Sequence, residues 1–109
     1  MAGHSCWELL AVSNVKRRVY QDNDEYTANL EEQDGILFVH VNLKTFDKGT
    51  ISTLRVEFDK LKRKLYQAGY EWVYSYSATP KLYRMFKGVE EIGTMTFEDK
   101  QYEVLRWKL

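Results

Sequence analysis

Residues 36–45 read Ile36-Leu-Phe-Val-His-Val-Asn-Leu-Lys-Thr45, a run with apolar side chains on both faces of an extended chain. A glycine-bearing turn at 46–50 and a long amphipathic segment from about Ile51 to Ala68 follow it. The aromatic-rich stretch at 70–77 comes next, and aromatic residues favour strands. This order predicts a strand, a helix and a second strand in a parallel or near-parallel right-handed crossover. Such units often bind ligands beside the helix N-terminus, so the loop at 46–50 is the first candidate site.

The long segment after the turn has the periodicity of an α-helix. Its apolar residues recur every three or four positions and form one stripe: Ile51, Leu54, Phe58, Leu61 and Leu65. Thr50 or Ser52 is the expected N-cap. Gly69 stands where a left-handed C-cap residue belongs. Four cations crowd residues 60–64, where positive charge complements the helix dipole and where a solvated helix face is the simplest explanation.

Short segments separated by turn signals flank this centre. Upstream, residues 7–12, 15–21 and 25–31 predict strands of an antiparallel meander. Downstream, Thr79 and Pro80 predict the cap and first residue of a short helix that reaches Lys87. Strands at 89–96 and 102–109 then form a terminal hairpin, whose core side consists of Glu103, Leu105, Trp107 and Leu109. The predicted fold class is α+β, a mixed, mostly antiparallel sheet of six or seven strands with one long and one short helix.

Composition limits the class of protein. The chain has 109 residues, and 1–109 is expected to be one domain, with residues 1–5 resembling an expression tag. Sixteen Lys and Arg residues balance 16 Asp and Glu residues, which argues against a protein that holds nucleic acid by overall charge. Cys6 is the one cysteine, so no internal disulfide is expected and a reducing, cytoplasmic location follows. No apolar run is long enough to span a bilayer, and no signal peptide is visible.

Few residues suggest chemistry on their own. His40 is the one histidine outside residues 1–5, and it is either a general base or a packed histidine of the sheet. Four glutamates at strand ends are either bases that act through water or surface carboxylates: Glu31, Glu32, Glu90 and Glu91. One cysteine and two histidines do not make a four-ligand zinc site, so no metal is expected. No P-loop or nucleophile elbow occurs.

The order of elements, with Thr79-Pro-Lys-Leu-Tyr-Arg-Met-Phe-Lys-Gly-Val-Glu-Glu-Ile-Gly93 and Tyr102-Glu-Val-Leu-Arg-Trp-Lys-Leu109, resembles the later part of a GNAT-type N-acetyltransferase. The resemblance covers about residues 37–109 and extends to the small GNAT-like proteins of tailed phages. It implies acetyl-CoA as cofactor and a site built from a strand, a loop and a tyrosine. The implied cofactor-binding residues are Asn42, Leu43 and Lys44 for the pantetheine arm, and Lys48, Gly49, Thr50 and Ser52 for the pyrophosphate. The implied catalytic residues are Tyr83, as acid toward the leaving thiolate, and His40, as base.

The sequence departs from the family pattern in three places. The family's Arg/Gln-x-x-Gly-x-Gly/Ala loop corresponds here to residues 46–52, where only Gly49 is kept and Asp47 adds a negative charge. The position four residues before Gly88, where the family often has its tyrosine, holds Arg84, and Tyr83 lies beside it. The stretch between residues 7 and 15 leaves no room for the two helices that shape the acceptor groove.

Three functions follow as hypotheses. The favoured one is a truncated GNAT-like scaffold that has lost acetyl-CoA chemistry and binds a protein partner, as a phage accessory or host-directed factor in the host cytoplasm or virion. Its many Tyr and Trp residues support it, because aromatics are enriched at interface hot spots. The second is a minimal acyl-CoA-dependent N-acetyltransferase. The third is nucleic-acid contact through Arg17, Arg18 and the cations at 60–64, which the neutral net charge disfavours.

Overall fold

The computed structural model describes residues 15–109 of the chain. They belong to two compact units, one ending at Thr45 and the other running from Phe46 to Leu109. The strand predicted at 7–12 lies outside the described residues. The expectation that 1–109 forms a single domain stays a prediction, and each unit is described by itself.

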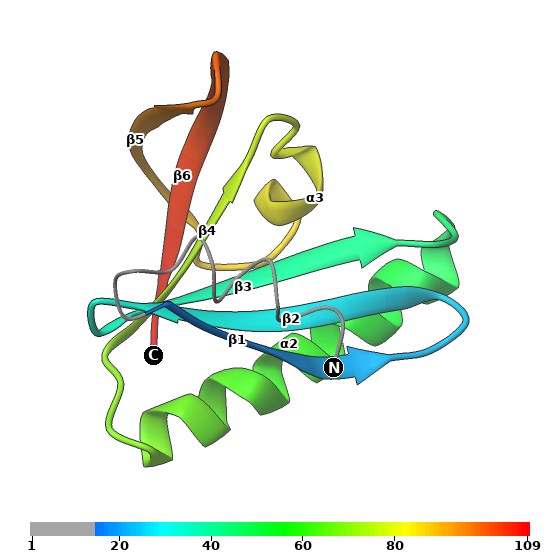
Figure 1. The fold of residues 1–109 in the computed structure, drawn as a ribbon. Helices are drawn as coiled ribbons and strands as arrows, with labels where there is room; N and C mark the ends of the chain where they lie inside the picture. Colours follow the sequence, from blue (N-terminus) through cyan, green and yellow to red (C-terminus); the bar gives the residue numbers. More distant parts are fainter. Residues whose placement is uncertain (1–14) are drawn as a thin grey trace. The chain divides into compact units, whose positions relative to one another are not determined.

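The first unit is an antiparallel meander of three strands, β1 (Val15–Asp22), β2 (Tyr26–Gln33) and β3 (Ile36–Leu43) (Figure 1). The β2–β3 hairpin closes through Asp34 and Gly35, whose φ angles are 53° and 81°. Two consecutive positive φ angles are the requirement of a type I′ turn, which Asp-Gly meets at low steric cost. The predicted meander is confirmed for the strands within residues 15–43.

The hairpin register gives the two faces of this unit different chemistry. Leu30 pairs with Val39, and both are buried with their same-face neighbours Ala28 and Leu37. The opposite face carries polar side chains, among them the buried Glu31. Side chains alternate between faces along a strand, so a one-residue slip would exchange the two sets. The register therefore decides which polar residues meet.

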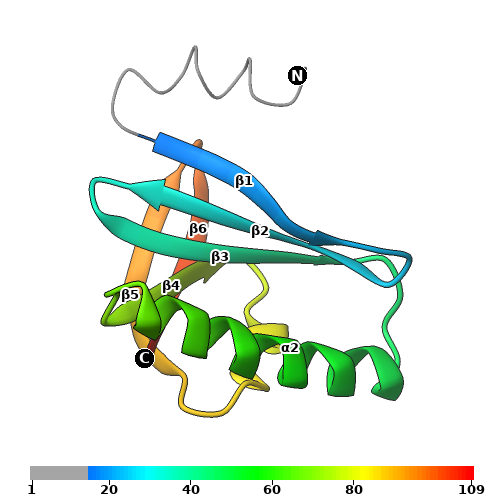
Figure 2. The ribbon, with the colours of Figure 1, turned by 90° about the horizontal axis from the view of Figure 1, so that it is seen from below.

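The second unit holds two helices and three strands. They are α2 (Lys48–Gln67), β4 (Trp72–Ser77), α3 (Lys81–Arg84), β5 (Glu90–Phe97) and β6 (Lys100–Lys108). Strand β6 pairs antiparallel with β4 on one side and with β5 on the other. Figure 2 shows α2 along this unit, with the end of the chain beside the last turn of the helix. With six described strands and two described helices, the predicted α+β class is confirmed.

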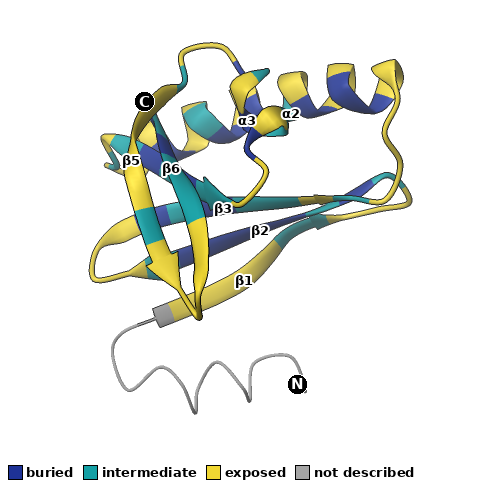
Figure 3. Cartoon of the chain, turned by 90° about the horizontal axis from the view of Figure 1, so that it is seen from above, coloured by how far each residue is buried: buried dark blue, intermediate teal, exposed yellow. Residues whose placement is uncertain are grey.

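The core of the second unit forms where α2 packs on β6. All five residues of the predicted apolar stripe are buried, as are Leu105 and Trp107 on the predicted core side of the last strand (Figure 3). The Phe58 ring meets the Trp107 ring edge-on, with centroids 5.0 Å apart. The Trp107 indole N–H donates to the Phe86 carbonyl oxygen at 3.4 Å, which satisfies the polar atom of a buried tryptophan.

Several predicted boundaries were wrong. Helix α2 begins at Lys48 rather than Ile51, because Asp47 is its N-cap in place of Thr50 or Ser52. Strand β3 ends at Leu43, because the amides of the next two residues both donate to the Glu25 carbonyl oxygen.

The C-terminal elements also differ in extent from the prediction. The short helix covers only Lys81–Arg84, and Pro80 rather than Thr79 occupies its N-cap position. The last hairpin turns at Glu98–Asp99, where φ is 51° and 64°, so β6 begins at Lys100 instead of Tyr102. The side chains of Glu98 and Asp99 did not identify these two residues as the turn. The turn requires a left-handed backbone rather than particular side chains.

Candidate functional site

The start of α2 is closed by an acidic side chain. Asp47 is extended (φ −140°, ψ 174°), and its carboxylate accepts the Thr50 N–H at 2.8 Å. Its own carbonyl oxygen accepts the Ile51 N–H at 3.1 Å. Thr50 itself is fully buried. The cap satisfies an amide that an anion would otherwise use, and its negative charge lies at the positive end of the helix dipole.

This arrangement disfavours the pyrophosphate of a coenzyme A cofactor at the Thr50 amide. Of the four residues predicted to hold it, Thr50 has its amide engaged and its side chain buried, whereas Lys48, Gly49 and Ser52 are exposed. Gly49 has helical backbone, and a Cβ added there would lie 3.3 Å from the Asp47 carboxylate oxygen. A phosphate approaching this helix end would therefore meet a fixed carboxylate.

The other predicted cofactor residues, Asn42, Leu43 and Lys44, lie at the end of β3 and just beyond it. Asn42 is exposed, and Leu43 pairs with Tyr26 of β2. The Lys44 ammonium donates to the Asp22 carboxylate at 2.8 Å and to the Asn23 carbonyl oxygen at 2.6 Å. That hydrogen bond, helped by one from the Thr27 hydroxyl, lowers the pKa of Asp22. Lys44 therefore links the residue after β3 to the end of β1 and the turn that follows it.

His40 and Glu31 form a pair on the polar face of the meander. The His40 Nε2 atom lies 3.2 Å from the Glu31 Oε1 atom, with the two side chains 13% and 3% exposed. The Phe38 ring stacks parallel to the imidazole at a centroid distance of 6.2 Å. A buried carboxylate on Nε2 orients the ring.

The sequence named both residues of this pair as separate base candidates but did not predict that they meet. The signal was the Asp34–Gly35 turn, because a two-residue hairpin loop sets the register of its strands. That register pairs Glu31 with Phe38 and Asn29 with His40, which makes Glu31 and His40 diagonal neighbours on one face. Diagonal neighbours across antiparallel strands are within reach of long side chains.

Tyr83, the predicted acid, lies in the core of the second unit. It is 5% exposed, and its ring meets the Trp107 ring edge-on at 6.1 Å. Its neighbour Arg84 is exposed and donates to the Glu91 carboxylate at 2.8 Å. This hydrogen bond lowers the pKa of Glu91 and raises that of Arg84. The catalytic role of Tyr83 stays a prediction, and its surroundings are those of a packing residue.

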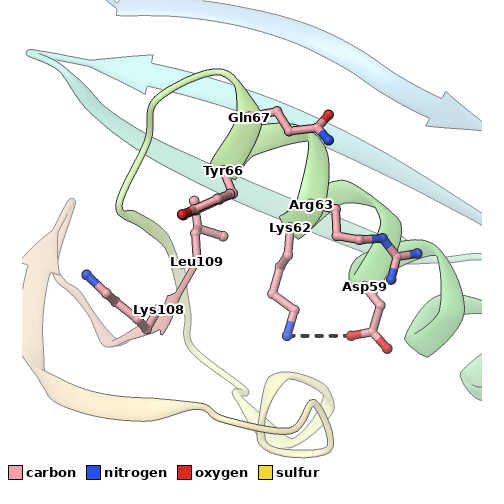
Figure 4. A pocket seen from close by; sticks show the side chains of 7 residues that line it. All are labelled: Asp59, Lys62, Arg63, Tyr66, Gln67, Lys108 and Leu109. Atoms are coloured by element: carbon pink, nitrogen blue, oxygen red, sulfur yellow. Dashed lines mark ion pairs between the residues drawn. The ribbon is translucent and has the colours of Figure 1, made fainter.

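The opposite end of α2 borders a groove that sequence reasoning missed. The groove has a volume of about 600 Å³. Its lining comes from the last turns of the helix and the end of the chain: Asp59, Lys62, Arg63, Tyr66, Gln67, Lys108 and Leu109 (Figure 4). The cations at 60–64 were interpreted as a solvated helix face, and nothing in the sequence pattern indicates that residues 108 and 109 lie beside them.

Neither a cluster of metal-binding side chains nor a membrane-spanning helix occurs in residues 15–109. Within that range no cluster of three or more His, Cys, Asp or Glu side chains could hold a metal ion. No helix in the described part of the chain is long and apolar enough to cross a membrane.

Comparison with known proteins places the fold. No protein-family model matches the sequence, and no curated protein matches it. A solved structure, the crystal structure of a "putative acetyltransferase from Agrobacterium tumefaciens", is similar with a TM-score of 0.58 and 14% identity. The match covers 99% of this chain and 91% of that one. At this identity the likeness shows the fold alone, and that fold is GNAT-like.

Proposed function

We propose that this chain is a GNAT-like scaffold that has lost acetyl-CoA chemistry and acts by binding a protein partner. The observation that carries the proposal is the Asp47 carboxylate, which caps α2 at 2.8 Å from the Thr50 amide nitrogen. A capping carboxylate and a pyrophosphate compete for the same helix end, and the carboxylate repels the phosphate charge. The helix start is built for stability rather than for anion binding.

The partner-binding half of the proposal rests on exposed side chains at the other end of the helix. Tyr66 is 66% exposed, and Arg63 is exposed one turn before it. Within residues 15–109 neither side chain has a hydrogen bond, an ion pair or a ring contact. Tyr and Arg are over-represented among residues that dominate interface energetics. The resemblance to phage proteins adds the expectation that the partner is a host or virion protein.

Calorimetric titration of the purified chain with acetyl-CoA and with CoA tests the proposal. We expect no heat and no thermal shift at millimolar ligand. Micromolar binding, about −8 kcal/mol, would overturn the loss of cofactor binding. In that event Gly49→Glu locates the ligand, because a bulky acid at that position blocks the start of α2. Lys100→Glu, an exposed charge reversal in the final hairpin, serves as its control.

A second candidate function is a minimal acyl-CoA-dependent N-acetyltransferase. The His40–Glu31 pair favours it, because a buried carboxylate hydrogen-bonded to an imidazole is an arrangement that positions a histidine for general-base chemistry. The similar structure from Agrobacterium tumefaciens is that of a "putative acetyltransferase", which points the same way. The amides of Lys48 and Gly49 have no acceptor within the described residues, so part of the helix end is open.

Acetyl transfer to a panel of primary amines separates the two candidates. The proposal expects no turnover above the uncatalysed rate. Turnover that falls in His40→Gln, and that shifts its pH profile in Glu31→Gln, would establish the enzyme instead. Turnover equal in wild type and His40→Gln would place any activity away from this pair.

A further inference from the structure

The groove at the C-terminal end of α2 has a composition that selects a particular kind of partner. Cations predominate on the helix as a whole, with six Lys and Arg side chains against two carboxylates between Lys48 and Gln67. The entire chain is neutral, with 16 of each sign. The excess positive charge is therefore concentrated on this element, and three of the chain's cations line the groove: Lys62, Arg63 and Lys108.

These three cations differ in how strongly they are already engaged. Lys62, whose side chain is half-buried, lies 3.5 Å from the exposed Asp59 carboxylate, and the exposed Lys108 lies 3.9 Å from the exposed Glu71 carboxylate. Surface pairs of this kind contribute little free energy, so an incoming carboxylate can replace either acid at small cost. Arg63 has no ion pair with any residue from 15 to 109. Its planar guanidinium is suited to bidentate binding of a carboxylate.

Apolar surface lies among the cations. Tyr66 presents its ring at 66% exposure, and the side chain of Leu109 lines the same groove beside it (Figure 4). The backbone beneath is held by a Schellman motif, in which the Gly69 amide donates to the Tyr66 carbonyl oxygen at 3.0 Å and the Tyr70 amide donates to that of Leu65 at 3.1 Å. A rigid helix end therefore presents both an aromatic anchor and positive charge.

We infer that this groove binds an acidic segment of a protein partner, with Arg63, Lys62 and Lys108 pairing with its carboxylates and Tyr66 contacting an apolar side chain between them. This inference rests on the proposed function and specifies the chemistry of the partner. Asp59 in the lining disfavours a continuous row of phosphates, and the neutral net charge weakens any general attraction to nucleic acid. The mixture of apolar surface and cations favours a peptide over a nucleic acid.

Fluorescence anisotropy with a short labelled peptide of alternating Glu and Leu residues tests the inference. We expect binding to weaken about tenfold in the Lys62→Glu/Arg63→Glu double variant. Each reversed charge lies at the edge of the groove and contributes only a modest part of the binding free energy. Lys64→Glu is the control for each single reversal, Lys62→Glu and Arg63→Glu, because it reverses one exposed charge on the same turn but does not line the groove. Tyr66→Ala should weaken binding without changing net charge. Raising the salt to about 1 M should remove most of the charge contribution.

Two results would overturn the inference. One is peptide binding that is absent, or that is equal in the double variant and Lys64→Glu, with both variants folded by near-UV circular dichroism. The other is tighter binding of a short oligothymidine than of the peptide. Neither result changes the outcome of the acetyl-CoA titration. The proposed loss of acetyl-CoA chemistry is therefore tested separately from peptide binding in the groove. Conversely, cofactor binding at the start of α2 would overturn the scaffold proposal while the peptide result stood.

Discussion

The two ends of α2 are closed by different means. At the start, a charged side chain makes the closing contact, between the Asp47 carboxylate and the Thr50 amide. At the finish, backbone makes it, through Gly69 at φ 98° and the amides that follow the helix. A charged side-chain cap places its charge on the surface around the helix end. A backbone cap leaves the surrounding side chains, here Arg63 and Tyr66, available to contact another molecule.

Under the proposed function, cofactor binding is lost at the start of α2 and a partner binds at its end. The helix start, where the family resemblance implies phosphate binding, carries a carboxylate of its own. The helix end, for which the resemblance implies nothing, borders a groove with cations and an exposed tyrosine. Stability and binding are thus assigned to opposite ends of one element, and each assignment responds to a different substitution.

The largest effect should come from the apolar stripe between the two ends. Leu61 is 3% exposed, and Leu61→Ala should lower the free energy of unfolding by about 2–5 kcal/mol. The capping contacts at both ends depend on the packing of this helix. Leu61→Ala should therefore weaken the two ends together. Denaturant unfolding measures it, with Val56→Ala, at a 55% exposed position of the same helix, as the control. A loss as small as that of the control would mean that the helix does not depend on this packing.

Gly69→Ala acts on the backbone cap alone. An alanine at φ 98° is strained in the left-handed region, so a loss of about 1–2 kcal/mol is expected. The matched control is Gly49→Ala, where the backbone is helical and the new Cβ lies 3.3 Å from the Asp47 carboxylate oxygen. Thermal unfolding should show the larger loss at Gly69. A larger loss in Gly49→Ala than in Gly69→Ala would mean that the Asp47 carboxylate is less able to move than the backbone of the C-terminal turn.

Asp47→Ala removes the side-chain cap and should cost about 1 kcal/mol. Asp47→Asn keeps an oxygen that accepts the Thr50 N–H but removes the charge, so it should lose only a few tenths of a kcal/mol. Chemical denaturation of the two variants separates the hydrogen bond from the charge. Equal losses in both variants would show that charge, rather than capping geometry, stabilises the helix start.

The smallest effect is expected at the cationic end. Arg63→Glu should change the free energy of unfolding by no more than about 0.5 kcal/mol, because surface substitutions away from packed features have small effects. Urea unfolding beside Lys64→Glu provides the comparison. A loss well above that of Lys64→Glu would show that Arg63 stabilises the helix, which would weaken its assignment to binding.

The sequence by itself determined the elements whose signals are local. The three- and four-residue spacing from Ile51 to Leu65 identified the buried stripe of α2, and Gly69 identified its end. The alternation in the last strand identified Leu105 and Trp107 as core. These predictions succeeded because the periodicity of helices and strands, and the conformational freedom of glycine, are properties of neighbouring residues.

Only the tertiary structure decided which distant side chains meet. The N-cap of α2 is a local exception: Asp47 and Thr50 are three residues apart, but the sequence also offered Thr50 and Ser52 as capping residues. Glu31 reached His40 through the register of a hairpin, and Lys108 joined Arg63 because β6 ends beside the last turns of α2. Such contacts depend on how elements pack, and packing is fixed by the shape of the whole core rather than by any local pattern of residues.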